Sequence, residues 1–170
     1  LGGISNSGMS SYSVILNGQT NLITGNSFSS VILNGSNHEI WDSSYFSSIA
    51  NGRQNKITGS NYAWLNGSGN TMLRMGFSSI LNGKSNILSP VNLSNYSSII
   101  NGFNNQIIGN YARFNLIGTG ANNIINSYSH TTILGGISNV VRATNGAFFS
   151  IFQGSGNTIQ PVGGSQYFMT

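Results

Sequence analysis

Residues 78–88 read SSILNGKSNIL, and residues 97–107 read SSIINGFNNQI. Closely similar stretches stand at residues 13–23 (SVILNGQTNLI) and 47–57 (SSIANGRQNKI). When the glycine of each Asn-Gly-like step is taken as an anchor, the pattern returns every 15 to 19 residues through ten units. A repeat of this length indicates a solenoid, in which each unit is one coil of a stack.

Four positions of the repeat keep one kind of residue from unit to unit. An isoleucine stands three residues before most of the anchoring glycines, and a second, mostly aliphatic residue follows it. An asparagine stands three residues after the glycine, and a further aliphatic residue stands two positions later. Stacked Ile columns are typical of a sheet core, Asn-Gly favours a tight turn, and a repeated Asn predicts either an amide ladder or exposed turns, of which we favour the ladder. The turn and ladder positions singled out are Gly18, Asn21, Gly52, Asn55, Gly83, Asn86, Gly102 and Asn105.

These columns predict an all-β fold, a parallel β-solenoid (β-roll) of about ten coils of ~17 residues. An Asn-Gly between two apolar runs is also compatible with an antiparallel meander. In a meander, however, successive strands run in opposite directions, so identical residues do not stack at one level. The repeat domain is expected to span residues 1–160, and residues 161–170 (PVGGSQYFMT) to form a cap or the start of a following segment.

Two neighbouring columns of the repeat are apolar. Because neighbours on a strand point to opposite faces, one column fills the core and the other forms a stripe on the outside. The pattern leaves open which of them is inside; in its unit Trp64 takes the first position and Leu65 the second. Aromatic residues, often four positions before the second column, extend the same stripe, although Phe28 and Tyr62 miss this offset by one. The expected core and interface positions are Ile15, Ile32, Ile80, Ile99, Leu16, Leu33, Leu81, Phe77 and Tyr96.

A continuous apolar stripe of this length is rarely left uncovered on a monomer. The most economical cover is another copy of the chain, and we therefore expect a homo-oligomer. Two alternatives are bends that bring both columns inside one thick coil, and a flat surface that faces a ligand.

The composition excludes several classes of protein. Charged residues make up 5% of the 170 residues, against roughly 25% in an ordinary domain. The six Lys and Arg residues are scattered along the chain, whereas a nucleic-acid-binding protein concentrates them on one face, so no nucleic-acid partner is expected. There is no run of about 18 apolar residues and hence no expected membrane insertion, and the lack of cysteine leaves no disulfide framework. The chain opens on Leu1 with no signal peptide, which suggests a piece of a longer polypeptide.

Motifs such as SSILNGKSN (78–86) and TTILGGISN (131–139) resemble the repeats in viral and phage fibre proteins and in the heads of trimeric autotransporter adhesins. The resemblance covers residues 1 to about 159. It implies a parallel β-roll, three chains to a trimer with one apolar face at the threefold axis, and a fibre segment that displays attachment contacts to a host-surface glycan or receptor. The adhesin repeat is shorter and favours small residues, so a viral fibre is the first expectation and a bacterial adhesin head the alternative. The expected localisation is the virion surface or the outside of a cell.

Few residues suggest chemistry, and no enzymatic activity, cofactor or metal is expected. His38 and His130 are the only histidines; the first stands in the Asn column and the second in a loop-like stretch that we assign to the surface. Glu39 and Asp42 are the only carboxylates, and Trp41 stands between them. Two carboxylates with a stacking ring are the residues that glycan cleavage or binding uses, so these three are candidate glycan contacts, although two solvated charges near a bend are the simpler interpretation.

A minor alternative is an ice-binding face. It depends on hydroxyl residues just before the Ile column, interrupted by Tyr62, Asn115 and Phe149. The hydroxyl residues of this array are Ser30, Ser47, Ser78, Ser97 and Thr131.

Overall fold

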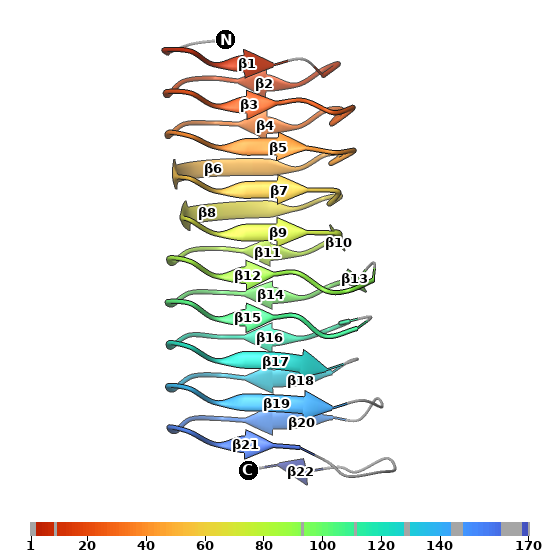
Figure 1. Cartoon of the computed structure of the whole chain (residues 1–170), viewed down its shortest axis with the longest axis vertical. Helices are drawn as coiled ribbons and strands as arrows, with labels where there is room; N and C mark the ends of the chain where they lie inside the picture. The colour runs from red at the N-terminus through yellow and green to blue at the C-terminus, as the bar shows by residue number, and fades with distance from the viewer. Residues whose placement is uncertain are drawn as a thin grey trace.

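The computed structural model describes residues 3–8, 10–92, 94–110, 112–127, 130–143, 148–160 and 168–169. The chain forms an all-β, parallel β-solenoid of about eight turns, with no helix among these residues (Figure 1). The ten coils expected from the repeat are not confirmed. Except for Phe168–Met169, the segment 161–170 that we expected to form a cap also lies outside the described residues.

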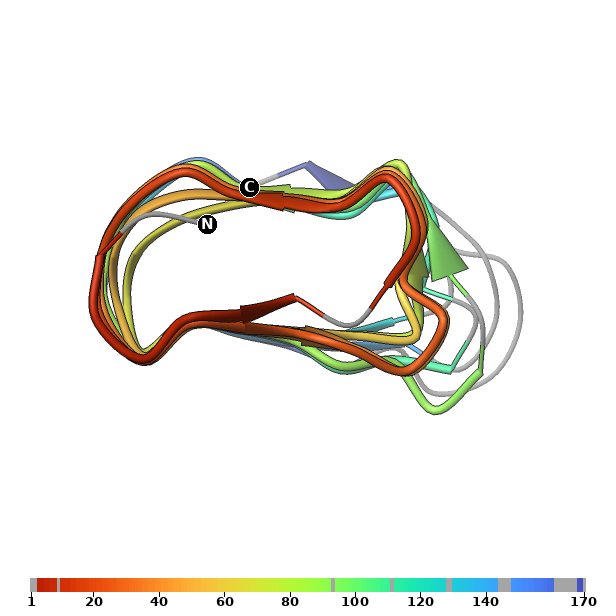
Figure 2. The same ribbon diagram turned by 90° about the horizontal axis from the view of Figure 1, so that it is seen from above.

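Two ten-stranded parallel sheets form the two broad walls of the solenoid. Viewed along the stack, they lie on opposite sides of a flattened coil (Figure 2). Sheet A contains β2 (Val14–Ile15), β4 (Val31–Ile32), β6 (Ser48–Arg53), β8 (Trp64–Ser68), β11 (Ser79–Ile80), β14 (Ser98–Ile99), β16 (Leu116–Ile117), β18 (Thr131–Ile133), β20 (Phe149–Ile151) and β22 (Phe168–Met169). Sheet B contains β1 (Ser7–Gly8), β3 (Leu22–Ile23), β5 (Glu39–Trp41), β7 (Lys56–Thr58), β9 (Thr71–Leu73), β12 (Ile87–Leu88), β15 (Gln106–Ile107), β17 (Ile124–Ser127), β19 (Val140–Ala143) and β21 (Thr158–Ile159).

The two turns of each coil differ in regularity. The turn that carries the Asn-Gly step leads from sheet A to sheet B, and its successive copies follow nearly the same path at one edge of the stack (Figure 2). The return turn varies more, and a short third sheet of β10 (Met75–Gly76) and β13 (Ser94–Asn95) lies there. The longest unit, with Pro90, passes through this edge. Insertions are therefore accommodated at the return turn, while the Asn-Gly turn stays constant.

The strand register stacks identical residues directly on one another. Ile80 pairs with Ile99 in sheet A, and Ile40 pairs with Ile57 in sheet B, with the strands parallel in both cases. Every strand pair among the described residues is parallel, so the antiparallel meander is excluded. Each new coil therefore buries the same side chains as the coil before it.

The structure decides which of the two neighbouring apolar columns faces the core, a choice that the sequence left open. The Ile column of sheet A points inward and is almost completely buried, while the residue after it points outward. The aliphatic column of sheet B closes the core from the other side. Burying one such side chain contributes about 2 kcal/mol, so each coil adds stability through its own pair of core residues. The buried predicted positions are Ile15, Ile32, Ile80 and Ile99, and the exposed ones are Leu16, Leu33, Leu81, Phe77 and Tyr96.

One unit departs from the expected columns. Ile49 pairs with Leu65, so Leu65 is buried and Trp64 points outward. Placing Trp64 in the Ile column is therefore wrong. The unit has one residue fewer between its buried position and Gly67, and the register shifts after Ile49 to realign the glycines.

The Asn column forms a continuous interior ladder at the Asn-Gly turn. The backbone N–H of Asn105 donates to Oδ1 of Asn86 at 3.0 Å, and Nδ2 of Asn86 donates to the carbonyl of Gly102 at 3.0 Å. The same pair of bonds joins Asn21 to the coils on either side, and Asn55 donates to the carbonyl of Gly67 at 2.7 Å. Each buried amide thus satisfies its own polar groups and the turn of the next coil.

Candidate functional site

Most of the large apolar side chains left exposed lie on one side of the molecule. Along sheet A, the residues directly before and after each buried position point outward. A third exposed column stands three residues before the buried position, at the corner where the chain enters sheet A. We call these three columns together the A-face. Of the 21 exposed large hydrophobic residues in the described part of the chain, 15 belong to it: Tyr12, Val14, Leu16, Leu33, Phe46, Tyr62, Trp64, Phe77, Leu81, Tyr96, Ile100, Phe114, Leu134, Phe148 and Phe152.

The corner column of the A-face is a ladder of stacked rings. From Phe46 to Phe114, successive ring centroids lie 4.6 to 5.4 Å apart with nearly parallel planes. Adjacent rings in register cover each other's faces, so the exposed part of each is its edge. The members of this ring ladder are Phe46, Tyr62, Phe77, Tyr96, Phe114, His130 and Phe148.

Two members of the ring ladder differ from the sequence-based assignment. Tyr62 is in line with Phe46 and Phe77, because its offset of one residue is cancelled by the short unit around Leu65. His130, assigned to the surface, is exposed, and its ring stacks on Phe114 at 5.1 Å. Counting back three residues from the buried position would have placed both in the column.

The backbone of the ring ladder is unusual. Six of its members, from Phe46 to His130, have φ between 48° and 60°. This left-handed region costs a residue with a Cβ roughly 1–2 kcal/mol, and bulky side chains seldom adopt it. The N–H of each left-handed residue donates to a carbonyl of the preceding coil, as Tyr62 does to Tyr45 at 2.9 Å. The corner therefore depends on coil stacking, and it sets every ring at the same height within its coil.

The two outward columns of sheet A compensate for each other in size from Trp64 onward, whereas Val14 with Leu16 and Val31 with Leu33 are both large and Ser48 with Ala50 are both small. Where the first column carries a large apolar residue, the second can be small or polar: Trp64 is followed by Asn66, and Leu116 by Gly118. Where the first column carries a serine, as at Ser79 and Ser98, the second carries Leu81 and Ile100. None of the charged residues of the chain stands in the three columns.

The candidate glycan contacts Glu39 and Trp41 lie on β5 of sheet B and Asp42 directly follows that strand, but the three do not form one site. Glu39 pairs with Lys56, with Nζ and Oε2 3.2 Å apart. The same ammonium group lies over the ring of Trp41, 5.0 Å from its centroid, so one ring face is covered. Glu39 and Lys56 line one surface hollow, whereas Asp42 stands at the return turn and lines another. The structure therefore does not bring the two carboxylates together on one side of a common cleft.

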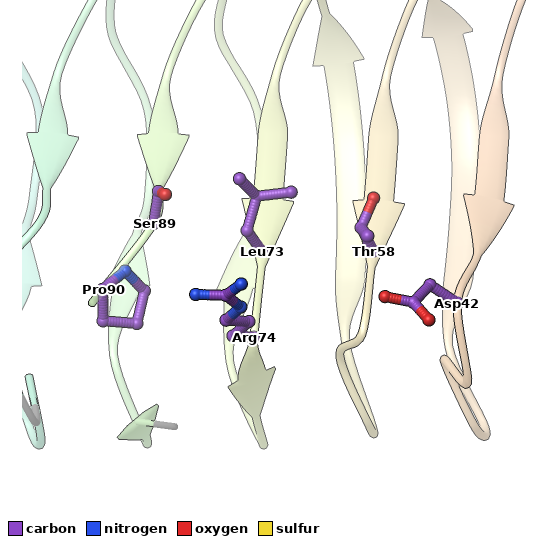
Figure 3. Close-up of a pocket in the computed structure, with 6 residues that line it drawn as sticks. All are labelled: Asp42, Thr58, Leu73, Arg74, Ser89 and Pro90. Carbon is purple, nitrogen blue, oxygen red and sulfur yellow. The ribbon is translucent and has the colours of Figure 1, made fainter. Parts of the chain in front are cut away.

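The hollow beside Asp42 is open and small, with a volume of about 240 Å³. Figure 3 shows the residues that line it, which come from four successive coils. A Cβ at Gly59 would lie 3.8 Å from Oδ2 of Asp42 and 4.0 Å from Cγ of Arg74, so the two charged side chains flank the gap that this glycine leaves. Nη1 of Arg74 also donates to the carbonyl of Val91 at 3.4 Å. The lining residues are Asp42, Thr58, Leu73, Arg74, Ser89 and Pro90.

The hydroxyl array on which ice binding was based lies inside the solenoid. Ser30 and Ser47 are fully buried, and the N–H of Ser47 donates to Oγ of Ser30 at 3.2 Å. Ser78, Ser97 and Thr131 are buried in the same column. Each of these residues stands two positions before a residue of the inward Ile column, so its side chain points to the same inner face. This array is therefore not available to ice.

His38 occupies one rung of the Asn ladder. Its Nδ1 accepts the N–H of Asn55 at 3.1 Å, and its Nε2 is buried without a hydrogen-bond partner among the described residues. Burial lowers the pKa of His38 below its ordinary value of 6.5. The neutral ring thus substitutes for the acceptor of an asparagine but not for its donor.

The part of the chain that the structure describes contains no cluster of His, Asp and Glu suited to a metal ion. It also contains no helix of the length and apolar character needed to cross a membrane. No protein-family model matches this chain, and the search of curated proteins found no match either.

Proposed function

We propose that this chain is a structural rod segment of a self-associating surface fibre, in which other copies of the chain cover the A-face. The observation that carries the proposal is the A-face itself. It is a long, repetitive, apolar surface on a fold that otherwise buries its aliphatic columns.

The extent of the A-face supports a second copy as the occupant. A half-exposed aromatic side chain offers on the order of 100 Å². Nine of the fifteen exposed side chains of the A-face are aromatic, and these nine alone exceed the roughly 800 Å² that one partner contributes to a standard interface. The absence of charge in the three columns agrees with the composition of interface cores.

The regularity of the A-face points in the same direction. Because every rung from Trp64 to Phe152 pairs one large outward residue with one small or polar residue, this part of the face suits an equally regular partner. A copy of the same chain repeats at the same strand spacing of about 4.8 Å, so contacts recur at every rung. An unrelated globular partner has no such period.

The finer parts of the proposal follow from the sequence resemblance. They are a stack of ten coils, three copies per assembly, a viral or phage origin, and the display of contacts to a host receptor or glycan. A bacterial adhesin head is the alternative source of the same architecture. Ice binding through the serine array is not proposed, because those serines are buried.

Sedimentation equilibrium at several concentrations tests self-association. We expect a trimer for the unmodified chain and a monomer for the double variant Leu81→Gln and Ile100→Gln, which places two amides on the A-face. The matched control is Ile87→Gln with Ile108→Gln; Ile87 lies on β12 of sheet B, Ile108 directly follows β15, and both are half-buried. A monomeric unmodified chain, or equal association of the two variants, overturns the proposal.

A second candidate function is saccharide binding at the hollow between Asp42 and Arg74. A carboxylate and a guanidinium that flank a small gap suit hydroxyl groups, and Leu73 and Pro90 supply apolar contact. A glycan array tests it with the unmodified chain, Asp42→Ala and Arg74→Ala. Binding that both substitutions remove supports this function, and an array without binding eliminates it.

A further inference from the structure

The Asn-Gly turns carry a chemical liability that differs from rung to rung. Six described rungs have an asparagine directly before the anchoring glycine, and five of these side chains are exposed, while that of Asn66 is half-buried. Asn-Gly is the pair in which the glycine nitrogen meets least steric hindrance on approaching the side-chain amide carbon. The six asparagines are Asn17, Asn34, Asn51, Asn66, Asn82 and Asn101.

Two of these six pairs have a geometry that the other four lack. The N–H of Gly52 donates to Oδ1 of Asn51 at 2.8 Å, and the N–H of Gly102 donates to Oδ1 of Asn101 at 2.7 Å. In the other four described pairs the structure has no such bond. A side-chain carbonyl bond is ~1.2 Å long, so the glycine nitrogen lies at most about 4 Å from Cγ in these two pairs. Reacting atoms in a near-attack conformation lie about 3–3.5 Å apart.

We propose that Asn51 and Asn101 are sites of spontaneous deamidation in the folded solenoid, and that they react ahead of the other four. The glycine N–H first loses its proton to hydroxide, and the nitrogen then forms a bond to Cγ of the asparagine. The tetrahedral adduct expels the side-chain nitrogen, which takes a proton from water and leaves as ammonia. Water opens the resulting succinimide at either carbonyl, giving aspartate or isoaspartate, so the net change is one water consumed and one ammonia released.

Deamidation at Asn51 or Asn101 would affect the Asn ladder, because the backbone carbonyl of each accepts a hydrogen bond from a ladder amide. The carbonyl of Asn51 accepts Nδ2 of Asn55 at 3.2 Å, and the carbonyl of Asn101 accepts Nδ2 of Asn105 at 3.4 Å. Isoaspartate adds a backbone methylene at this turn, which displaces the carbonyl from the amide of the ladder. Either product also adds a negative charge to a chain with only two carboxylates. Deamidation at these two rungs therefore weakens the bond that holds each ladder amide to the turn of its own coil.

The experiment is an incubation of the folded chain at mildly alkaline pH in heavy-oxygen water, followed by proteolysis and peptide mass spectrometry. Heavy oxygen in the product marks deamidation that occurred during the incubation. We expect the label at Asn51 and Asn101 to accumulate about threefold or more faster than at the other four sites. The four other described Asn-Gly pairs of the repeat are the internal controls; a seventh pair of the sequence, Asn145-Gly146, lies outside the described residues.

A parallel incubation in urea separates geometry from local sequence. In the unfolded chain all six sites lack the hydrogen-bonded turn, and we expect their rates to converge. Equal rates in the folded chain, or slower reaction at Asn51 and Asn101, overturn the proposal. A preference for these two sites that persists unchanged in urea also overturns it, because the flanking residues then cause it.

Discussion

The backbone N–H of Asn55 donates to Nδ1 of His38 at 3.1 Å, in a column where every asparagine from Asn6 to Asn139 presents its Oδ1 to the next coil. One ring nitrogen thus continues the ladder, while Nε2 stays buried without a partner in the described residues. An acceptor at Nδ1 requires the neutral ring protonated at Nε2. The rung is intact only while His38 is uncharged.

The first prediction is that His38 makes stability depend on pH. Burial lowers the pKa of His38 in the folded chain below 6.5, its value in the unfolded chain. The unfolded chain therefore binds the proton more readily, and stability that is complete above pH 6.5 is lost as the pH falls below that value. Urea denaturation of the unmodified chain at a series of pH values measures this loss.

The matched variant is His38→Asn, which restores both the acceptor and the donor of the rung. We expect a gain of about 1 kcal/mol at neutral pH, because an unpartnered buried group is removed. We also expect the slope below pH 6.5 to flatten. A slope identical in both proteins would contradict this assignment.

The second prediction concerns a regular rung of the ladder. Asn105→Ala removes the acceptor for the N–H of Asn123 and the donor to the carbonyl of Gly120. Because both groups remain inside the turn, we expect a loss of about 2–3 kcal/mol in the free energy of unfolding. Asn126→Ala, at an exposed position of β17, is the control and should change stability by less than about 0.5 kcal/mol. Equal effects would mean that the ladder adds no stability.

The repeat columns show which parts of the fold could be predicted from the sequence and which could not. The repeat predicted the parallel solenoid because a period of identical residues fits no other stacking. It could not decide between Ile15 and Leu16 for the core, since both are aliphatic and adjacent. Ser30 and Ile32 stand two residues apart, so their side chains lie on the same face, and the burial of both identifies that face as the inner one. Serine was interpreted as a surface residue, whereas in the coil it is buried and bonds to Ser13 and Ser47.

Anchoring the repeat on glycine caused the errors that remained. Trp64 was placed in the Ile column because one unit lacks a residue between its buried position and Gly67. His130 was left out of the ring ladder because its column was defined by aromatic residues alone. Physical spacing within the coil is set by the buried residue, and alignment on Leu65 and Ile133 recovers both positions.

The third prediction is that the anchoring glycines of the Asn-Gly turn cannot be replaced. A Cβ on Gly83 would lie 2.3 Å from the carbonyl oxygen of Gly102, and its φ is +104°. We expect Gly83→Ala to cost about 3 kcal/mol or more, since backbone of the next coil must move. Gly69→Ala, with φ +62° and no atom closer than 3.8 Å, should cost only about 1–2 kcal/mol. Thermal unfolding of both variants measures the difference, and equal losses would refute the close-approach argument.

The fourth prediction separates the fold of the ring ladder from its proposed role in assembly. Phe77→Gly removes the stacking of one ring on Tyr62 and Tyr96, which costs about 1 kcal/mol for each contact. It also relieves the left-handed backbone at φ 48°, which returns roughly 1–2 kcal/mol. We therefore expect the free energy of unfolding of the isolated coil stack to change little. Because a large apolar contact leaves the A-face, sedimentation equilibrium should show weaker association. If Phe77→Gly instead unfolds the chain without first weakening association, the ladder serves the fold and the A-face loses its main support as an interface.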